Sequence, residues 1–560
     1  MGIGLCGDSG HVYFFPRVSS GLVRGLRGKR LIGHNLKGDA HWLRKWGFSI
    51  NPRLFAYDTL LAAHLLDSSR SSYSLKDIAA DYLGWQWPSY SDMVHPDPEH
   101  PKKKITLDAQ ETERVARYCG TDVLATFKLT EYFQTKLSPD QRLYVEELEL
   151  PMLRILYQME ERGIMVDVEK LRTLDREWAL EEGYWEDEFQ AYFNEPVNIR
   201  SPKQVLEALT KFSSKTAYKP LSGKGPVFSL KSTNSKHLEK YKDRVCVKEL
   251  LQYRAINKLR STYTTALLEL PTMPRVHTTF NQWGTITGRL SSSDPNLQNI
   301  PVRTENGKEL RKAFIASPGN TLIIADYSQI EYRFLAHLSE EPVLLNSFRN
   351  GKDVHEETAK VLGIDRRLGK TLNFAAIYGA QAPKIAQTAG ISVQEADRFL
   401  KRYWQRLPKA AAWINKAKLL ARQRGGIYTM LRRFIALPDI NLKCENISPC
   451  GSGSFQRRAC KSCYMRWTAE RCAVSYEIQG SAAELIKKAM VELDKEGLKP
   501  ILQVHDELVF DVEECDSDFD ECAKHGDRLR NIERIMTNVM KLDVPIEVSI
   551  ATGPNWGVKE

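Results

Sequence analysis

The sequence predicts a multi-domain chain of the α/β class, and three observations support this prediction. The chain has 560 residues, 42% of them hydrophobic, which is enough for several cores. Short apolar runs alternate with helical patterns over residues 1–135, as in a small α/β domain. Two strand candidates, residues 321–328 and 501–510, are separated by a long and mostly helical segment, which indicates one sheet with a large helical insertion.

The first 270 residues are predicted to be largely helical. Residues 54–66 and 118–133 carry apolar side chains at the helical period, so both are expected to form helices. Residues 138–167 begin with Ser-Pro-Asp, a typical helix start, and continue as a long amphipathic helix that ends at Gly163. Residues 168–270 continue this helical pattern.

Bulk features exclude a membrane or secreted protein. No apolar run approaches the roughly 20 residues that a membrane helix requires. The N-terminus has no basic leader followed by a long apolar stretch, so no secretory signal is expected. Ten cysteines are too few for a disulfide scaffold in a chain of this length. We therefore expect a cytoplasmic protein with reduced thiols and no membrane partner.

Positive charge is concentrated in one segment. The net charge is +10, and residues 200–260 alone contain 15 Lys and Arg against four Asp and Glu. A local excess of this size indicates a polyanionic partner such as a nucleic acid. The alternative is a solvated lysine-rich loop, because Ser, Thr, Gly and Pro also crowd residues 213–235.

Two carboxylates are placed where strands end. The apolar run 321–325 leads into Asp326, and an amphipathic helix follows it. The second candidate strand, ILQVHDELVF, carries His505, Asp506 and Glu507 at its middle, which indicates a hairpin turn. Two such carboxylates repel each other unless cations hold them, and two divalent metals would also catalyse phosphoryl transfer. Taken alone, an aspartate at either position is more often a turn residue or a helix cap, so the metal hypothesis needs a phosphate-binding partner.

A cationic and aromatic helix supplies a possible phosphate site. In RRLGKTLNFAAIYGA, residues Arg366, Lys370, Phe374 and Tyr378 recur every four positions. Four residues turn a helix by about 400°, so the four side chains form one slowly winding stripe. The two cations would neutralise a triphosphate near the positive helix N-terminus, and the aromatics would stack on a sugar and base. The alternative is an ordinary amphipathic helix with Phe374 in the core.

Four motifs together resemble the family A DNA polymerases, the DNA polymerase I group. They are TGRLSSSDPNLQNIP (287–301), DYSQIEYRFLAHLS (326–339), RRLGKTLNFAAIYG (366–379) and VHDE (504–507), in the expected order. The resemblance runs from about residue 140 to the end of the chain. The smaller phage-type members are the most similar, because no 5′-nuclease domain precedes the rest. A phage replicating in a bacterial cytoplasm is the source that this resemblance implies.

The resemblance assigns the catalytic roles. Asp326 and Asp506 match the family's metal-binding aspartates, with the Tyr327 carbonyl and Glu507 as further ligands. Lys370 matches the residue that donates a proton to the leaving pyrophosphate. The implied cofactors are two Mg²⁺ ions, for which Mn²⁺ would substitute, and the implied reaction is DNA-directed DNA synthesis in replication or repair.

The resemblance also assigns the nucleotide and DNA contacts. Glu331 matches a steric gate that leaves no room for a 2′-hydroxyl and so favours dNTPs. Phe374, where other members have Tyr, implies discrimination against dideoxynucleotides. The matching dNTP-binding residues are Gln329, Glu331, His355, Arg366, Lys370, Phe374 and Tyr378. The matching primer–template residues are Arg289, Asn296, Gln298, Gln479 and His505. Ser475 and Glu477 stand where Asn and Pro are common in the family, a departure that concerns the nearby primer–template contacts and not the chemistry.

A right-hand architecture is implied. The expected thumb is residues 139–269, the palm is 270–340 with 495–560, and the fingers are 341–494. The basic segment 200–260 then lies in the thumb, which grips duplex phosphates. Primer–template DNA and dNTPs are the implied partners of a monomeric enzyme, with any replisome or processivity factor unknown.

Residues 1–138 resemble the family's RNase H-like 3′–5′ exonuclease domain without its first strand. Asn35 and Asp39 match its second motif, and Tyr118 and Asp122 match its third. The first motif, Asp-x-Glu, is absent: the only acidic residue before Asp39 is Asp8, and no Glu follows two residues later. Residues 1–16 are expected to form the second strand of that sheet. Proofreading is therefore predicted to be absent or severely impaired.

Residues 441–471 form a cysteine-rich insertion relative to the family. Cys444, Cys450, Cys460 and Cys463 would suit a tetrahedral Zn²⁺ site, although the Cys-x₅-Cys half is wider than the usual spacing. The alternative is a basic loop with reduced thiols.

For the whole chain, the alternative to a polymerase is a catalytically inactive DNA-binding remnant. Single-subunit RNA polymerases also use two metal-binding aspartates, but Glu331 and the TGRLSS stretch argue against membership of that class.

Overall fold

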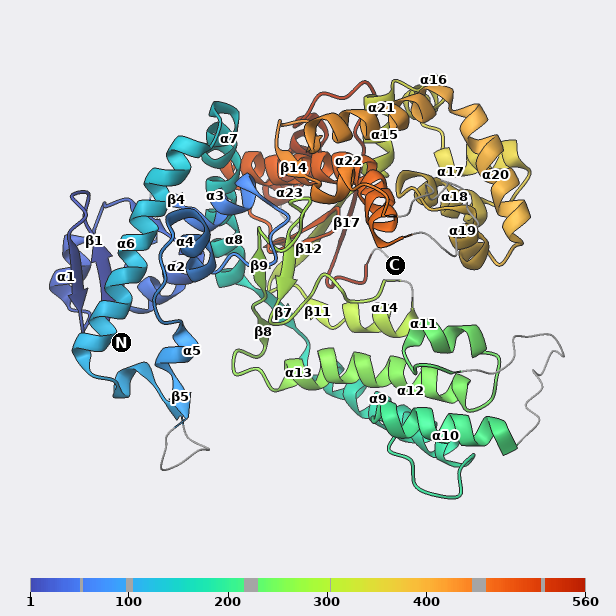
Figure 1. Ribbon diagram of the computed structural model, residues 1–560, viewed down its shortest axis with the longest axis horizontal. Helices are drawn as coiled ribbons and strands as arrows, with labels where there is room; N and C mark the ends of the chain where they lie inside the picture. Colours follow the sequence, from blue (N-terminus) through green and yellow to red (C-terminus); the bar gives the residue numbers. More distant parts are fainter. Residues whose placement is uncertain are drawn as a thin grey trace.

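The protein is described by a computed structural model that covers residues 2–50, 54–96, 104–215, 230–302, 304–445, 460–514 and 519–558. Figure 1 shows three regions around a central sheet. The N-terminal domain (blue) lies on the left, a group of helices (green) lies below, and a second helical group (yellow to orange) lies at the upper right. No helix in the described part of the chain combines the length and the apolar surface that crossing a bilayer requires.

The described part of the N-terminal domain contains three two-stranded sheets, β1-β2, β3-β4 and β5-β6, and the long helix α6. β1 pairs with β2 antiparallel and β3 with β4 parallel. The strands are β1 (Ile3–Cys6), β2 (Val12–Phe15), β3 (Leu31–Gly33), β4 (Phe55–Asp58), β5 (His95–Pro96) and β6 (Lys104–Ile105). The helices are α1 (Ser20–Gly25), α2 (Leu36–Lys45), α3 (Thr59–Leu66), α4 (Leu75–Leu83), α5 (Tyr90–Met93), the 3₁₀ turn η1 (Leu107–Ala109) and α6 (Thr112–Lys136).

Two predictions for this domain need correction. Within the predicted strand 1–16, residues 3–15 form a hairpin of two strands where one was expected, because Gly7 and Gly10 close a tight turn in which Gly10 adopts a φ of 79°. Residues 54–66 are helical only from Thr59, because Asp58 ends strand β4 and caps α3 by accepting from the Leu60 N–H at 2.9 Å. The helix predicted at 118–133 is confirmed within α6.

The helix predicted from residue 138 is confirmed, with a π-helical segment inside it. It comprises α7 (Pro139–Tyr144), η2 (Val145–Glu149) and α8 (Leu150–Arg162), and Ser138 forms a capping box with Gln141. Gly163 ends α8 with a φ of 56°. α8 packs against α2 and β4 on one side and against α22 on the other. Its Glu160 pairs with buried Lys37 of α2, which fastens the N-terminal domain to the rest.

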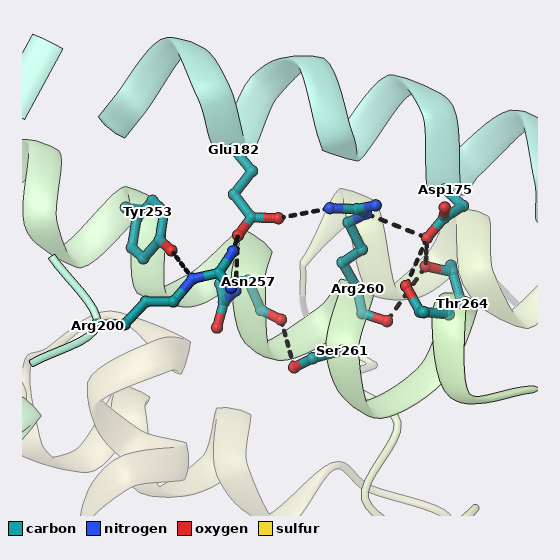
Figure 2. Close-up of polar contacts among 9 residues, drawn as sticks. Asp175, Glu182, Arg200, Tyr253, Asn257, Arg260, Ser261 and Thr264 are labelled. Carbon is teal, nitrogen blue, oxygen red and sulfur yellow. Dashed lines mark hydrogen bonds and ion pairs between the residues drawn. The ribbon is translucent and has the colours of Figure 1, made fainter. Parts of the chain in front are cut away.

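A helical group with its own core follows. It comprises α9 (Val168–Gln190), α10 (Pro202–Lys215), α11 (Ser235–Leu238), η3 (Glu239–Tyr241), α12 (Val247–Leu259), η4 (Arg260–Thr264) and α13 (Thr265–Leu268). Its apolar cluster, which includes Phe189, Leu209 and Leu250, is separate from the main core. Figure 2 shows the polar contacts that join α9 to α12 and η4. There Glu182 accepts hydrogen bonds from Arg200, Asn257 and Arg260 at 3.0, 2.6 and 3.0 Å.

The central sheet is antiparallel, with the strand order β15-β16-β12-β17. Its strands are β12 (Asn320–Tyr327), β15 (Leu502–Val504), β16 (Glu507–Glu513) and β17 (Val548–Gly553), so both predicted strands are confirmed and lie in one sheet. Smaller elements flank it: β7 (Ile164–Val166), β8 (Arg275–Val276), β9 (Thr279–Asn281), β10 (Ser291–Ser293), β11 (Phe314–Ile315), α14 (Glu305–Arg311) and α23 (Phe519–Asn538). Leu322, Ile323 and Ile324 of β12 are fully buried, which explains the apolar run.

The insertion between β12 and β15 is mostly helical, as predicted. It comprises α15 (Ile330–Ser339), α16 (Pro342–Arg349), α17 (Val354–Leu362), α18 (Arg366–Ile377), α19 (Ala382–Ala389), α20 (Val393–Arg406), α21 (Pro408–Arg424), the hairpin β13 (Gly426–Tyr428) and β14 (Phe434–Ala436), η5 (Pro438–Asn441) and α22 (Lys461–Lys495). α15 packs on α21 and α22, so the insertion returns to the sheet from which it starts.

Candidate active site

A two-residue turn carries the central carboxylate. Val504 of β15 pairs with Glu507 of β16, so only His505 and Asp506 connect the two strands. His505 adopts a φ of 55°, a left-handed conformation that non-glycine residues seldom take and that tight hairpin turns require. The Tyr327 N–H donates to the Asp506 carbonyl at 3.1 Å, which ties this turn to the end of β12. The neighbouring residue, Asp326, pairs with Glu507 across the ladder.

Asp506 is poised to accept a cation. Its side chain is 28% exposed, but its buried Oδ1 atom makes no hydrogen bond within the described residues. Burial raises the pKa of Asp506 to about 6; Arg289 lowers it, while Glu331 and Asp326 raise it further. The nearest cation, Arg289 Nη2, is 3.8 Å away from that oxygen. A buried oxygen without a donor, beside a second carboxylate, is a donor set that suits a hard divalent ion such as Mg²⁺.

Glu507 faces a different set of partners. The Trp556 indole N–H donates to Glu507 Oε1 at 2.7 Å, and Arg311 lies 4.0 Å from the same oxygen. Its side chain is 12% exposed. Glu507 therefore braces the C-terminal segment against the sheet, and its role as a metal ligand stays a prediction.

Glu331 joins three segments at the first turn of α15. One of its oxygens pairs with Arg289, and the other accepts the Tyr378 hydroxyl at 2.8 Å. Burial, followed by the charge of Glu331, raises the pKa of Tyr378 well above its ordinary value, so the phenol stays a donor. The predicted gate residue thus lies with Arg289, Tyr378 and Asp506 in one cluster.

The predicted cationic and aromatic helix is α18. Its two cations differ in their partners, because only one of them is held in an ion pair among the residues that the structure describes. Arg366 is held by Asp353, the N-cap of α17, through Nε and Nη2 at 2.8 and 2.6 Å. Lys370 is exposed, forms no ion pair within the described ranges, and lies 6.0 Å from the Phe374 ring centre. Phe374 is half-buried, and Tyr378 follows the last helical turn. Lys370 is therefore the cation of this stripe that can meet an anion without breaking an ion pair.

His355 is buried beneath this helix. It is 2% exposed, contacts the amide of Asn373 at 2.8 Å and packs against the rings of Tyr332 and Phe374. Burial lowers the pKa of His355 to about 4; Asp353 opposes this effect, while Lys370 and Arg366 add to it. The imidazole is therefore neutral near pH 7. Its expected phosphate contact stays a prediction and would need this helix to move.

Several predicted primer–template residues support the turn. The Gln298 amide donates to the Gln503 carbonyl and side-chain oxygen at 3.1 and 2.9 Å, and Gln503 donates to the His505 carbonyl. Asn296 accepts from Ser292 and from the Asn299 N–H within its own loop. Gln479 is half-buried on α22. Gln329 begins α15 in the left-handed region, and its buried Oε1 has no partner among the described residues.

Sequence reasoning missed two supporting residues. Gln503 is 4% exposed inside an otherwise apolar strand, and a polar residue at a buried strand position was the available signal. Asp353 holds Arg366 and also caps α17 through the His355 N–H at 2.8 Å. Its Asp-Val-His-Glu context is an N-cap pattern, but the pairing with Arg366 joins residues 13 positions apart and depends on how α17 and α18 pack.

Two of the predicted exonuclease residues, Tyr118 and Asp122, lie beside a lysine. Asp122 pairs with Lys76 Nζ and accepts the Trp87 indole N–H at 2.8 Å. The Lys76 ammonium lies 4.4 Å from the centre of the Tyr118 ring. Burial raises the pKa of Asp122, and Lys76 opposes this effect. Asp39 is exposed on α2.

Three of the four predicted zinc ligands come together. The Sγ atoms of Cys444, Cys460 and Cys463 all lie within 4.8 Å of one another. Cys450 lies outside the described residues.

Comparisons with known sequences identify the family of this chain. The sequence model described as DNA polymerase family A matches residues 168–558, and the one described as 3′-5′ exonuclease matches residues 20–138. The chain therefore belongs to DNA polymerase family A, with an exonuclease domain preceding the polymerase domain.

The relatives include full-length bacterial polymerases. DNA polymerase I of Pseudomonas aeruginosa is 35% identical over 94% of this chain and 56% of its own length. The thermostable DNA polymerase I of Thermus filiformis is 39% identical over 77% of this chain and 50% of its own length. The chain thus spans about half the length of these relatives. The polymerase domain of M. smegmatis Pol1, solved with a DNA primer–template and dNTP, superposes with a TM-score of 0.81 at 28% identity, over 99% of this chain and 92% of that one.

Proposed function

We propose that this chain is a DNA-directed DNA polymerase that adds dNTPs to a primer 3′ end. The observation that carries the proposal is the two-residue turn that places Asp506 Oδ1, which accepts no hydrogen bond among the described residues, beside Asp326, where the helical insertion leaves and rejoins the sheet. Membership of DNA polymerase family A and the likeness to a polymerase solved with primer–template and dNTP support this assignment.

Asp326 and Asp506 are the proposed metal ligands. Family A DNA polymerases use divalent metal ions, generally Mg²⁺. Two such ions, with Mn²⁺ as a substitute, would supply charge neutralisation at the attacking and leaving oxygens of the transferred phosphoryl group. We further assign the Tyr327 carbonyl to the same set, and Glu507 to a peripheral position because Trp556 and Arg311 already engage it.

The nucleotide is proposed to lie along α18. Lys370 is exposed and without an ion pair among the described residues, so it is placed to contact the triphosphate and to give its proton to the leaving pyrophosphate. Arg366 would exchange Asp353 for phosphate, which keeps its charge paired in both states. Phe374 and Tyr378 would then face the sugar and base, and Glu331 would exclude a 2′-hydroxyl.

DNA is proposed to lie between the His505–Asp506 turn and the helices α9–α13, which include the basic segment 200–260. We assign α9–α13 to the thumb, the β12–β15–β16–β17 sheet to the palm, and α16–α22 to the fingers. The segment α7–α8, included in the predicted thumb, packs against α2, β4 and α22 and is better assigned to the base of the molecule. Arg289, Asn296, Gln298, Gln479 and His505 are the proposed primer–template contacts.

Proofreading is proposed to be weak in this chain. The carboxylate that the third exonuclease motif supplies, Asp122, already has the Lys76 ammonium and the Trp87 indole as partners. A catalytic metal would have to displace both. This observation is independent of where the chain begins.

Primer extension tests the main proposal. The intact chain, with a recessed primer–template and Mg²⁺, should extend the primer with dNTPs and much less with rNTPs. Asp506→Ala should abolish extension, since removing one metal ligand removes the site. The matched control is Glu513→Ala, which removes an exposed carboxylate from the same strand, β16, and should extend normally.

The outcome separates an enzyme from an inactive DNA-binding protein. No extension by the wild-type chain, combined with tight and salt-sensitive DNA binding, would overturn the polymerase assignment in favour of a binding role. Equal extension by wild type and Asp506→Ala would show that the turn is not the catalytic site.

A further inference from the structure

Three cysteines converge where the helix α22 begins, well outside the polymerase cluster in sequence. Cys444 follows η5, Cys460 is the N-cap residue of α22, and Cys463 lies in its first turn. Their sulfur atoms all lie within 4.8 Å of one another, and the Cys444 and Cys460 sulfurs are 3.8 Å apart. Cys463 is fully buried, and the other two are half-buried.

The spacing of the sulfur atoms matches metal coordination. Zinc binds thiolates at about 2.3 Å in tetrahedral geometry, which places neighbouring sulfurs about 3.8 Å apart. A disulfide would need about 2.05 Å. The observed 3.8 Å between the Cys444 and Cys460 sulfurs equals the tetrahedral edge. We propose that Cys444, Cys460 and Cys463 bind a structural zinc ion.

The surroundings favour thiolates over thiols. The Cys463 N–H donates to the Cys460 sulfur at 3.4 Å, as part of the cap of α22. Arg466 donates from Nη2 to the Cys463 sulfur at 3.6 Å and from Nη1 to the Leu442 carbonyl at 3.1 Å. Three thiolates around one Zn²⁺ leave a net charge of −1, which the helix N-terminus and this guanidinium offset.

The ligand type distinguishes this site from the proposed polymerase site. Thiolates are soft ligands that select zinc, whereas the oxygen ligands of Asp326 and Asp506 select magnesium. The nearest carboxylate in sequence, Glu445, is already engaged by the Ser462 hydroxyl. A zinc ion in the sulfur cluster would therefore persist in buffers that contain excess Mg²⁺.

The site lies where it can hold α22 in place. Cys444 and Cys460 come from chain segments on either side of residues 446–459, so one metal ion would hold these two segments together at the start of α22. Two turns further along α22, Glu470 pairs with Arg422 of α21 at 2.5 Å. Arg471 packs so closely on Gly379, just after α18, that a Cβ added there would lie 3.0 Å from its side chain. The zinc would thus position the helix that supports the end of α18.

Metal content tests the proposal without any nucleotide. The intact chain is purified with a phosphine reductant and no chelator, dialysed against excess Mg²⁺, and analysed for zinc by mass spectrometry. We expect about one zinc per chain. Cys444→Ser should lose most of it, and because Cys444 is half-buried outside the helix, this variant should still fold. The matched control is Cys472→Ser, a half-buried cysteine of the same helix outside the cluster, which should retain its zinc.

Cobalt substitution provides a second readout. Co²⁺ in the wild-type protein should give thiolate-to-metal charge-transfer absorption, which Cys444→Ser should reduce and Cys472→Ser should not. Circular dichroism of the variants shows that each is folded. Absence of zinc from wild-type protein even after incubation with ZnCl₂, or equal zinc in wild type and Cys444→Ser, would overturn the proposal. Zinc bound by carboxylates would give that second result.

Discussion

The Tyr378 hydroxyl, just after α18, donates a 2.8 Å hydrogen bond to the Glu331 carboxylate on α15. The other oxygen of Glu331 pairs with Arg289, whose guanidinium also lies 3.8 Å from Asp506. One arginine therefore connects the carboxylate that would meet the sugar with the carboxylate that would meet the metal. Glu331 is only 8% exposed, so its own contacts with Arg289 and Tyr378 are largely shielded from water.

Sugar selection should depend on the bulk of Glu331. Glu331→Ala opens space for a 2′-hydroxyl, so the ratio of kcat/KM for dNTPs over rNTPs should fall by about 10- to 100-fold. The same variant should also slow dNTP incorporation, because Arg289 loses its buried partner. Steady-state kinetics of single-nucleotide insertion measures both effects.

Tyr378→Phe is the matched control for that prediction. It removes only the hydrogen bond to Glu331 and keeps the shape of the pocket, so the ratio should change by about fivefold or less, equivalent to about 1 kcal/mol. If Glu331→Ala leaves the ratio unchanged, the steric gate lies elsewhere.

In the absence of metal, the ionised Asp506 carboxylate should lower the free energy of unfolding. Its pKa is raised from 3.8 to about 6, so its contribution to folding is fully present below pH 3.8 and is lost as the pH rises through about 6. At pH 8 without metal, Asp506→Asn should therefore raise the free energy of unfolding by about 1–3 kcal/mol. The difference should disappear near pH 4. Urea unfolding at both pH values measures it.

Magnesium should reverse this difference. Ion binding to the native state should stabilise the wild-type protein at pH 8 and leave Asp506→Asn almost unchanged. The control is Glu513→Gln on the same strand, an exposed carboxylate for which neither pH nor Mg²⁺ should alter the comparison with wild type. A destabilised Asp506→Asn variant at pH 8 would show that the carboxylate has a structural role.

Excision of a mismatched 3′ end should be nearly absent. The Lys76 ammonium neutralises Asp122, so wild type and Asp122→Ala should remove a terminal mismatch at the same slow rate. The assay is done without dNTPs, in an Asp506→Ala background, so that extension cannot mask excision. Metal-dependent excision that disappears in Asp122→Ala would contradict this prediction.

The sequence predicts most of the helices and strands but few of the pairings between residues that are distant in sequence. The strand at 320–327 and the helix α18 follow from apolar periodicity, which is a local property. The Asp506 turn followed from polar residues inside an apolar strand. By contrast, the Lys76–Asp122 pair joins residues 46 positions apart, so no local pattern indicates it. The hairpin at 3–15 differs from the single predicted strand because the Gly-Asp-Ser-Gly segment, residues 7–10, forms a turn between β1 and β2.

Glu182 accepts hydrogen bonds from Arg200, Asn257 and Arg260 (Figure 2), and its side chain is 5% exposed. Glu182→Ala leaves these donors without their shared acceptor, so it should lower the free energy of unfolding by about 3 kcal/mol. It should also shorten each synthesis run, because α9 and α12 lose their alignment, while single-nucleotide insertion at saturating DNA should change little. Denaturant unfolding and trapped primer extension measure both. Glu177→Ala, an exposed change on the same helix, is the control, and equal stability of the two variants would refute the proposed role.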